Sequence, residues 1–341
     1  MGNIAPSLIY NVGILFVMMI PGILLKKCGL STDGIGKGIS NLVLYIAQPA
    51  LVFLAYLRPY DSKILVNAAY VLLFSVVAHG IFALVTMNCY KKAPDSAKRM
   101  LRFATIFSNA AFMGIPLIDA VLGNEATLYA SVYNITFNLF LWSLGVHICT
   151  SNRDYDGDGD VDQIDEGVER LHKNEASVKK ALLHPVTIAA ALGLICFFFL
   201  PSGLYSGEIQ NRGYDFAIDC LTMLKNLVAP LSMTVIGLRL ADISFKGFFK
   251  DKNLYVFLAL RHILLPAAVF FVMRLLTLVG LNIDKQVIAV VLIMACAPAA
   301  SSATMFAEKY DCDASYVSKI VAVSTILSLL TMPLMVLLLN L

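Results

Sequence analysis

The sequence is short of charge, and that shortage excludes a soluble globular fold. Only 14% of its 341 residues are charged, whereas about a quarter are charged in a typical soluble domain. Apolar residues make up 59% of the chain, and the mean hydropathy is +0.77. The charged residues gather in short segments that separate long apolar runs. This pattern predicts an all-α polytopic membrane protein whose outer surface contacts lipid.

Sequence motifs of common enzymes and pumps are missing as well. The chain contains no HExxH, no GxSxG and no paired intramembrane aspartates, so we expect no enzymatic activity. It contains no Walker loop, which argues against ATP-driven transport by this chain alone. No nucleic-acid partner is expected.

Cysteine pairs and targeting signals are also absent. None of the seven cysteines belongs to a CxxC pair, and those in apolar runs are expected to pack as small hydrophobes. No basic segment precedes the first apolar run and no small-residue cleavage site follows it. Pro6 stands where a myristoylation motif requires Ser or Thr. We therefore expect neither signal cleavage nor myristoylation.

The apolar runs are long enough for ten membrane-spanning helices. A hydrocarbon core about 30 Å thick requires about 20 apolar residues in a helix. Ten spans fit the charge distribution better than nine or eleven. The predicted spans are Leu8–Leu25, Gly38–Leu57, Ile64–Met87, Leu101–Leu122, Ala126–Cys149, His184–Leu200, Phe216–Leu240, Leu254–Val279, Gln286–Phe306 and Val317–Leu339.

Lysine and arginine are distributed unevenly between the two sides that these spans define. With the N-terminus outside, the inner loops hold eighteen of these residues, and the outer loops hold only Arg58, Lys63, Arg212 and Lys285. Because cytoplasmic loops carry the excess of positive charge, we predict that both termini lie outside and the central loop is cytoplasmic. We expect the membrane to be a bacterial inner (plasma) membrane.

The chain divides into two halves that repeat some features. A polar interval separates five spans in residues 1–149 from five in residues 184–341, with residues 150–183 as a cytoplasmic linker. An odd number of spans per half gives the second half the opposite orientation, as in inverted-repeat carriers. Pro49 and Pro230 are each followed at the same offsets by Leu, Arg and Asp. These echoes favour two inverted five-helix repeats.

The fourth and ninth spans each contain a central proline among small and polar residues. Pro116 follows Ser108-Asn109-Ala110-Ala111, and Pro298 precedes Ala299-Ala300-Ser301-Ser302. Proline interrupts helical hydrogen bonding, and broken helices at membrane depth line cavities or lie buried in protein. Interruptions at corresponding positions therefore favour a binding site. The alternative is a pair of kinks that only shape the bundle.

These same residues resemble the signature of the auxin efflux carrier family, which includes plant PIN-formed proteins and bacterial organic-anion carriers. Residues 107–117 resemble its FxNxxFxGxPL motif, and Asn41-Leu42-Val43 through Pro49 resembles its N-(F/L)-V-x-x-x-x-x-P element. Ala297-Pro298, followed by Met305-Phe306-Ala307-Glu308-Lys309-Tyr310, resembles its segment ending in FAxxY. The resemblance covers nearly the whole chain outside the central loop.

The resemblance implies a fold in which helices four and nine break and cross at the substrate site. It implies a scaffold of helices one, two, six and seven, with Pro49 and Pro230 at its crossover, against which the other six move as an elevator. It further implies small organic anions as substrates, such as carboxylates, and a homodimer formed through the scaffold. PIN-like ninth spans often carry a second proline where this chain has Ser301, Ser302 and Thr304.

An anion at mid-membrane needs hydrogen-bond donors, because an unsatisfied charge in low dielectric is costly. Helix N-termini at the breaks would supply oriented amides. Each asparagine could instead serve helix–helix hydrogen bonding. The candidate substrate-binding residues are Asn109, Gly114, Pro116, Asn134, Asn138, Pro298, Ser301, Ser302 and Thr304.

Ionisable residues inside spans are candidates for coupling. His79 could titrate, or it could be a packing residue, and Asp119 could pair with a coupling cation or with a lysine. Lys225, Arg261 and Arg274 are expected to reach toward the interface with their charged ends. The sequence contains no recognisable sodium site, so the coupling ion is left open between H⁺ and Na⁺.

The central loop carries an acidic pattern typical of calcium-binding loops. Residues 154–165 follow D-x-[DN]-x-[DN]-G, with Val161 at the usual hydrophobic position. Position twelve is Asp instead of Glu, which reduces the reach for bidentate ligation. The alternative is a solvated acidic linker. The predicted Ca²⁺ ligands are Asp154, Asp156, Asp158, Asp160 and Asp165.

Three functions remain in competition. The leading interpretation is a secondary active, elevator-type carrier that moves small organic anions across the bilayer, with efflux as the expected direction. An anion channel lined by the broken helices is the first alternative. A calcium-responsive membrane receptor that binds a ligand without flux is the second.

Overall fold

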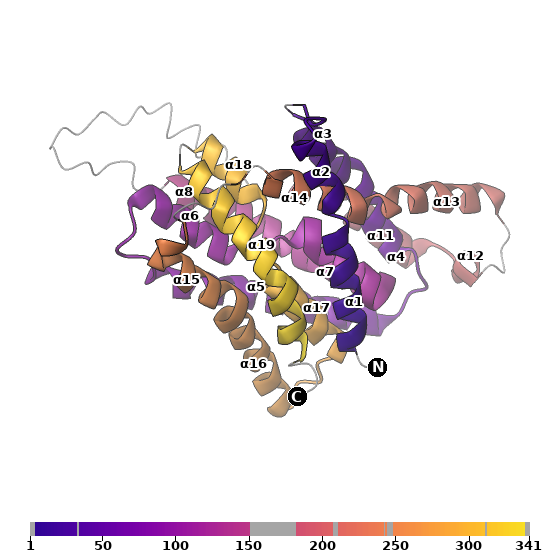
Figure 1. Cartoon of the computed structure of the whole chain (residues 1–341). Coiled ribbons are helices and arrows are strands. Elements are labelled where there is room, and N and C mark those ends of the chain that lie inside the picture. Colours follow the sequence, from indigo (N-terminus) through magenta and orange to yellow (C-terminus); the bar gives the residue numbers. More distant parts are fainter. Residues whose placement is uncertain are drawn as a thin grey trace, which may run out of the picture.

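All elements that the computed structural model describes are helices, joined by short loops (Figure 1). The description covers residues 4–32, 34–150, 182–206, 211–241, 243, 248–310 and 312–337. The α-helices are α1 (Ile4–Val17), α2 (Ile20–Lys27), α3 (Ile35–Leu42), α4 (Gln48–Tyr56), α5 (Ser62–Met87), α6 (Asp95–Ile106), α7 (Ile115–Phe140), α8 (Val146–Thr150), α11 (Pro185–Phe199), α12 (Ser202–Ser206), α13 (Arg212–Asn226), α14 (Val228–Ala241), α15 (Lys252–Ala259), α16 (Leu265–Leu278), α17 (Lys285–Cys296), α18 (Ser302–Lys309) and α19 (Ala314–Val336). The prediction of an all-helical polytopic membrane protein is confirmed.

Seven helical stretches among the described residues are long and apolar enough to cross a membrane, three fewer than predicted. The fourth and fifth predicted spans fall together in one stretch, 110–150, that bends at Gly123. The sixth and ninth correspond to the shorter apolar helices α11 and α17. The fourth and fifth spans count as one stretch because helical turns continue on both sides of Gly123. The break after Cys296 shortens the ninth span, and α11 has only 15 residues.

Three widened helical turns come directly before a proline. The π-helical turns η1 (Val43–Ala47), η2 (Ala110–Gly114) and η5 (Leu260–Leu264) lead into α4, α7 and α16. The next helix in each case carries proline in its first turn, as Pro49, Pro116 and Pro266. Proline donates no hydrogen bond and crowds the carbonyl four residues earlier, which favours a wider turn before it. The prolines therefore mark local widening of a helix that continues.

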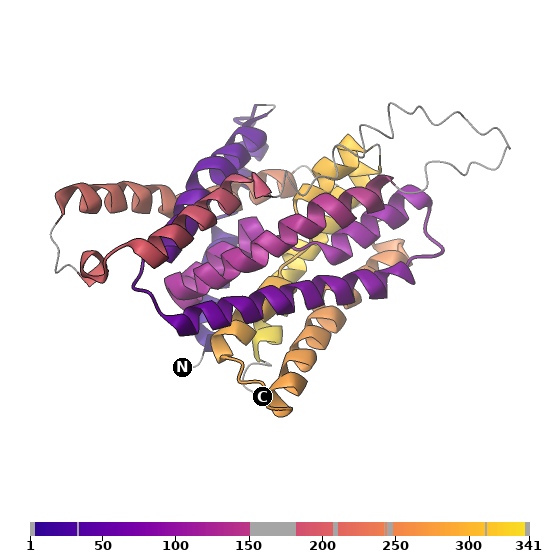
Figure 2. The same cartoon turned by 180° about the vertical axis from the view of Figure 1, so that it is seen from behind.

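The helices pack in two groups. The first group consists of α2, α3, α4, α11, α13 and α14, with its main contacts between α2 and α14 and between α4 and α11. The second group consists of α5 to α8 and α15 to α19. Figure 2 shows its long helices α5 and α7 side by side, and α17 packs against both. Helix α1 contacts α7, α14 and α19, so it lies between the groups.

Glycine allows the closest approach within the first group. A Cβ on Gly22 of α2 would lie 2.0 Å from the Thr234 carbonyl oxygen, and a Cβ on Gly237 of α14 would lie 2.0 Å from the Met19 carbonyl oxygen. Any larger residue at either position would push the two backbones apart. Small residues are the usual means by which helices approach closely in lipid.

Candidate functional site

The chain leaves the helical conformation at two places, and the two unwound segments cross. Residues 107–109 follow α6, and residues 297–301 follow α17. Ser108 and Ala299 form an antiparallel bridge between these segments. The backbone of the fourth predicted span therefore pairs directly with that of the ninth, and we call this place the crossing.

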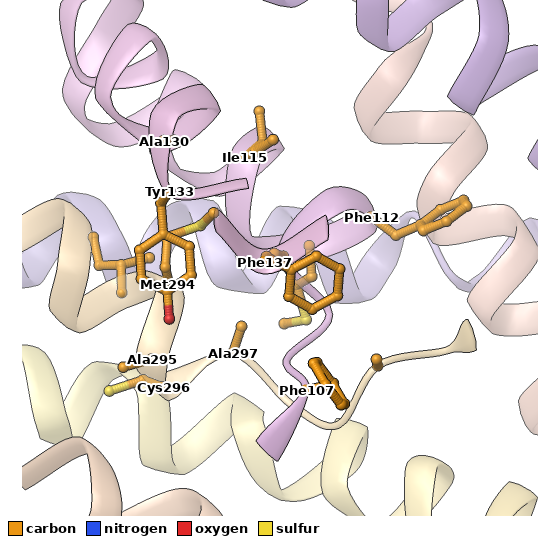
Figure 3. Packing of buried hydrophobic residues seen from close by; sticks show 14 of the residues in the cluster. Phe107, Phe112, Ile115, Ala130, Tyr133, Phe137, Met294, Ala295, Cys296 and Ala297 are labelled. Carbon is orange, nitrogen blue, oxygen red and sulfur yellow. The ribbon is translucent and has the colours of Figure 1, made fainter. Parts of the chain in front are cut away.

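Two backbone hydrogen bonds hold the crossing together. The Asn109 amide donates to the Pro298 carbonyl over 2.7 Å, and the Ala300 amide donates to the Phe107 carbonyl over 2.9 Å. Figure 3 shows the two extended segments passing each other beside Phe107 and Ala297. These bonds satisfy four buried backbone groups that would otherwise be costly to leave unpaired.

Four helix ends meet at the crossing. Helices α6 and α17 end there with their carbonyl groups, whereas η2, which continues into α7, and α18 begin there with their amides. Each end carries about half an elementary charge, negative at the C-terminus and positive at the N-terminus. The two positive ends are suited to an anion.

Several buried polar side-chain atoms near the crossing have no hydrogen-bond partner among the described residues. They include Ser108 Oγ and Asn109 Nδ2 in the crossing and Gln48 Oε1 beside η2. The amide nitrogen of Gln48 does donate, to the Ala111 carbonyl of η2 over 3.1 Å. Because buried polar atoms are nearly always hydrogen-bonded, this cluster has spare capacity for a polar ligand.

The hydroxyl residues of the ninth span separate into two places. Ser301 is buried at the crossing, with its Oγ 3.5 Å from Asn109 Oδ1. Ser302 begins α18 beside it. Thr304 lies one turn further on, and its Oγ1 is 3.3 Å from Ser318 Oγ of α19. Ser301 is therefore brought together with Asn109, whereas Thr304 contacts a neighbouring helix.

The two asparagines of the fifth predicted span have different partners. Asn138 Nδ2 donates to the Asn134 carbonyl over 2.9 Å, so its side chain bonds to its own helix. Asn134 is buried, and its Oδ1 has no partner within the described part of the chain. Asn134 retains capacity for a ligand, whereas one donor of Asn138 is already used.

The prolines chosen from the sequence do not occupy equivalent places. Pro298 lies inside the unwound segment 297–301, whereas Pro116 lies in the first turn of α7, beyond the break. The helix continues from η2 through Pro116, and the widened turn accommodates the absence of an amide donor at proline. Gly114, just before it, faces α17, where an added Cβ would lie 2.7 Å from Met294 Sδ.

The expectation that Arg261 reaches the membrane interface is wrong. Its side chain belongs to η5 and is fully buried, with 0% exposure. The guanidinium donates from Nη1 to the Thr105 carbonyl over 3.1 Å and from Nη2 to the Ala297 carbonyl over 2.7 Å. These carbonyls belong to the ends of α6 and α17, so Arg261 contacts the crossing through the two helix ends that precede the unwound segments.

His262 joins the crossing to α19 through hydroxyl groups. Its Nε2 lies 2.8 Å from Ser324 Oγ, which accepts the Ala299 amide over 2.9 Å. Its Nδ1 lies 2.9 Å from Thr331 Oγ1, which donates to the Leu327 carbonyl. Because each hydroxyl has one proton, Ser324 donates to Nε2 and Thr331 accepts from Nδ1. The network thus fits a neutral imidazole protonated at Nδ1.

His79 is buried among aromatic rings. Its Nδ1 donates to the Ser75 carbonyl over 2.7 Å, a bond within α5. A histidine in such surroundings fits either packing or proton exchange, so its coupling role stays a prediction. The rings around it are those of Phe107, Tyr133, Phe137 and Phe140, with the Phe140 ring stacked on the imidazole at 5.1 Å.

Asp119 lies at a turn that divides α7. Gly123 has φ +80° and ψ −174°, a conformation that L-residues avoid, and it reverses the chain there. The Asp119 carboxylate accepts from Thr127 Oγ1 over 3.0 Å and pairs with the Lys225 ammonium at 2.9 Å. Of the two partners predicted for Asp119, the structure shows the lysine.

Further polar contacts join the first and second packing groups. Two lie near the Gly123 turn and one lies at the crossing itself. They are the Arg58–Glu125 ion pair at 2.9 Å, the Tyr56–Ser131 hydroxyl contact at 3.0 Å and the bond from Arg239 Nη1 to the Ser301 carbonyl at 2.6 Å.

A separate surface cavity of about 310 Å³ lies where α5 and α17 begin. Lys63 and Asp284 line it and pair at 3.0 Å. Burial acts to raise the pKa of Asp284, but the Gln286 amide and the Lys63 ammonium outweigh it and hold that pKa below its usual range. The cavity is distinct from the crossing.

The predicted calcium ligands at residues 154–165 lie outside the described residues, so the calcium site stays a prediction. Among the residues that are described, no group of three or more His, Cys, Asp or Glu side chains could hold a metal ion.

Sequence reasoning missed three polar residues that contact the crossing, Gln48, Arg239 and Ser324. Gln48 is a single polar residue within an apolar span, and Ser324 is one of several hydroxyl residues along α19; both are signals for function or helix contact. Arg239 lies in the last turn of the apolar helix α14, like an ordinary interfacial cation. Only its bond to the Ser301 carbonyl distinguishes it.

An all-helical membrane protein with two crossing unwound segments is consistent with a membrane transport protein. A family model described as membrane transport protein matches residues 7–336. The chain therefore belongs to this membrane transport family, the family of the auxin efflux carriers, as the resemblance predicted.

Two relatives match over nearly their full length. An uncharacterized transporter of Methanothermobacter thermautotrophicus is 26% identical over 322 residues, covering 93% of this chain and 94% of the relative. An uncharacterized transporter of Methanocaldococcus jannaschii is 23% identical over 326 residues, covering 94% and 95%. The chain is an integral membrane protein of a transporter family, and the family is not an enzymatic one.

Proposed function

We propose that the protein is a secondary active carrier for small organic anions, with carboxylates as the substrate class. The observation that carries this proposal is the cluster at the crossing. There the unpaired Nδ2 of Asn109 and Oγ of Ser108 lie beside the positive ends of η2 and α18. A carboxylate accepts several hydrogen bonds, and donors that are already oriented stabilise it out of water.

We further propose that the carrier works as an elevator. The first packing group, with α1, corresponds to the four scaffold helices that the resemblance implies, and the second group contains the crossing. Among the described residues, the polar contacts between the groups include separate ion pairs and hydrogen bonds, which can break and re-form as one group moves past the other. Substrate would move together with the second group.

The inverted repeat of ten spans, divided at residues 150–183, belongs to the same proposal. Two features support it. The first, second, sixth and seventh predicted spans contain α2, α4, α11 and α14. In an inverted repeat the first span corresponds to the sixth and the second to the seventh, so the α2–α14 contact should have a counterpart between α11 and α4. Both contacts are extensive. Helix α1 begins and α19 ends on the same side of the molecule, as an even number of spans requires (Figure 1).

The substrate class is tested by thermal shift of the purified protein against dicarboxylates, indole acids and bile-acid-like anions. Asn109→Ala should abolish the stabilisation given by any anion that binds. Asn138→Ala is the matched control, since the Asn138 side chain already bonds to its own helix, and should retain it. An anion that stabilises both variants equally would move the site away from the crossing.

A carrier is distinguished from a channel in proteoliposomes. Saturable uptake with counterflow of the anion found above supports a carrier, whereas unsaturable flux without counterflow supports a channel. The coupling ion is identified by imposing H⁺ and Na⁺ gradients in turn. Efflux as the direction in the cell and a homodimer through the scaffold are proposed from the resemblance. External termini are proposed from the distribution of lysine and arginine, and a bacterial inner membrane remains the expected location.

A calcium-responsive role is a second proposal, favoured by the acidic pattern at residues 154–165. Calcium would order the segment that joins the two halves and thereby affect their relative movement. Isothermal titration of the purified protein with Ca²⁺ should show binding that is lost when Asp154 and Asp156 are both changed to Asn. A chain that gives no heat with Ca²⁺ would exclude this role.

A further inference from the structure

The Arg261 guanidinium bridges the two helix ends that precede the breaks. Nη1 donates to the Thr105 carbonyl in the last turn of α6, and Nη2 donates to the Ala297 carbonyl that follows α17. The Phe82 ring lies over the guanidinium carbon at 5.3 Å. Nε, a further donor of the guanidinium, is buried without a hydrogen-bond partner in the described chain. A single cation therefore ties both halves of the crossing together.

This charge has no carboxylate partner among the described residues. A buried arginine stays charged, and a buried charge requires compensation. The ends of α6 and α17 each carry about half a negative charge. Two such ends together are equivalent to about one negative charge, so they match one guanidinium.

The widened turn η5 explains how the Arg261 side chain reaches the crossing. Arg261 and His262 are adjacent and both fully buried, although adjacent residues of a regular α-helix do not share a face. The widened turn η5 allows both side chains to point inward. Arg261 then reaches the carbonyls before the breaks, and His262 reaches the network that holds the Ala299 amide.

We propose that Arg261 is a built-in counter-cation that gives the crossing its selectivity for anions. It neutralises the two carbonyl ends, so the positive ends of η2 and α18 remain to attract the substrate. It also occupies the position between backbone carbonyls where a metal cation would find oxygen ligands. Anion binding therefore requires neither Na⁺ nor K⁺. This inference rests on the proposed anion carrier for the identity of the ligand, but its cation part stands on the contacts of Arg261 alone.

The test compares Arg261→Ala, Arg261→Lys and Arg261→Met by thermal unfolding of the purified full-length protein. The control is Arg274→Ala, which removes the same charge from the other end of the same span. Arg261→Ala should lower Tm by roughly 5 °C or more, and millimolar guanidinium chloride should restore part of the loss. Choline chloride should restore nothing, and Arg274→Ala should not respond to guanidinium. Wild-type Tm should be unchanged when choline replaces Na⁺ and K⁺.

The three variants separate charge from packing. Lys and Met have similar length, so Arg261→Lys should be the more stable if charge matters. Equal stability of these two variants, or a loss in Arg261→Ala that guanidinium cannot restore, overturns the proposal. A specific stabilisation of the wild type by Na⁺ or K⁺ does the same. If Arg261→Ala cannot be purified, the Lys and Met pair decides.

The outcome is separable from that of the proposed function. Anion stabilisation of the wild type, with failure of guanidinium rescue, would leave the carrier proposal standing and remove the role of Arg261. Guanidinium rescue in a protein that no anion stabilises would leave the role of Arg261 standing and remove the carrier proposal. When both parts hold, Arg261→Met should lose anion stabilisation or acquire a requirement for Na⁺, and a variant that binds the anion unchanged without Na⁺ would contradict the selectivity claim.

Discussion

The Lys225 ammonium lies 2.9 Å from the Asp119 carboxylate and joins the two packing groups of the molecule. Lys225 belongs to α13 of the first group, and Asp119 belongs to α7 of the second, next to the turn at Gly123. Lys225 also donates to Asn124 Oδ1 over 2.7 Å, on the other side of that turn. One cation therefore holds the tip of the α7 hairpin against the first group.

Separating this ion pair should destabilise the present conformation. Both side chains are mostly buried, with 17% and 20% exposure, so a double-mutant cycle with Lys225→Met and Asp119→Asn should give a coupling energy of about 1–3 kcal/mol. If the groups slide as proposed, the single variants should also change the transport rate, because the pair must break in each cycle. Additive effects on Tm would show that the contact does not hold the groups together.

Enlarging Gly22 should destabilise the α2–α14 contact. An alanine Cβ there would lie 2.0 Å from the Thr234 carbonyl oxygen, and relieving such an overlap costs about 1–3 kcal/mol. Gly13, in the preceding helix α1, has open space around its Cβ position. Gly13→Ala should therefore be neutral or slightly stabilising. The measurement is thermal unfolding of both variants, and an equal response would contradict the close approach.

Removing the Ser324 hydroxyl should weaken the crossing. The Ala299 amide loses its acceptor and His262 loses a donor, and a buried unsatisfied group costs about 1–3 kcal/mol. The control is Ser328→Ala, one turn further along α19, because the Ser328 hydroxyl donates to a carbonyl of its own helix. Ser324→Ala should lower Tm more than Ser328→Ala, and it should weaken anion binding as well.

Replacing His79 should reveal whether it exchanges protons during transport. If it does, His79→Gln should retain the fold but abolish acidification of the lumen when anion uptake is followed with an internal pH dye. His262→Gln is the control, since the contacts of His262 with two hydroxyls fit a neutral imidazole, and we do not expect it to carry protons. Unchanged proton movement in His79→Gln would leave His79 as a packing residue within its aromatic surroundings.

The positions of the two helix breaks could be predicted only in part from the local sequence. Two central prolines correctly drew attention to the fourth and ninth spans, yet only Pro298 lies in an unwound segment. Pro116 is tolerated near the start of α7, because the widened turn η2 before it accommodates the missing amide donor. The first break, at residues 107–109, contains no proline. It is held by hydrogen bonds from the other half of the chain.

Hydropathy and charge are one-dimensional properties, and for that reason the sequence alone determined that this chain is an all-helical membrane protein. Its motif at residues 107–117 was likewise sufficient to indicate the transporter family. The tertiary structure alone decided that Arg261 is buried, that Asn109 meets Ser301 and that Lys225 pairs with Asp119. Each depends on groups brought together from distant parts of the chain. A buried arginine is acceptable only where helix ends supply the opposite charge, and no local pattern records where those ends meet.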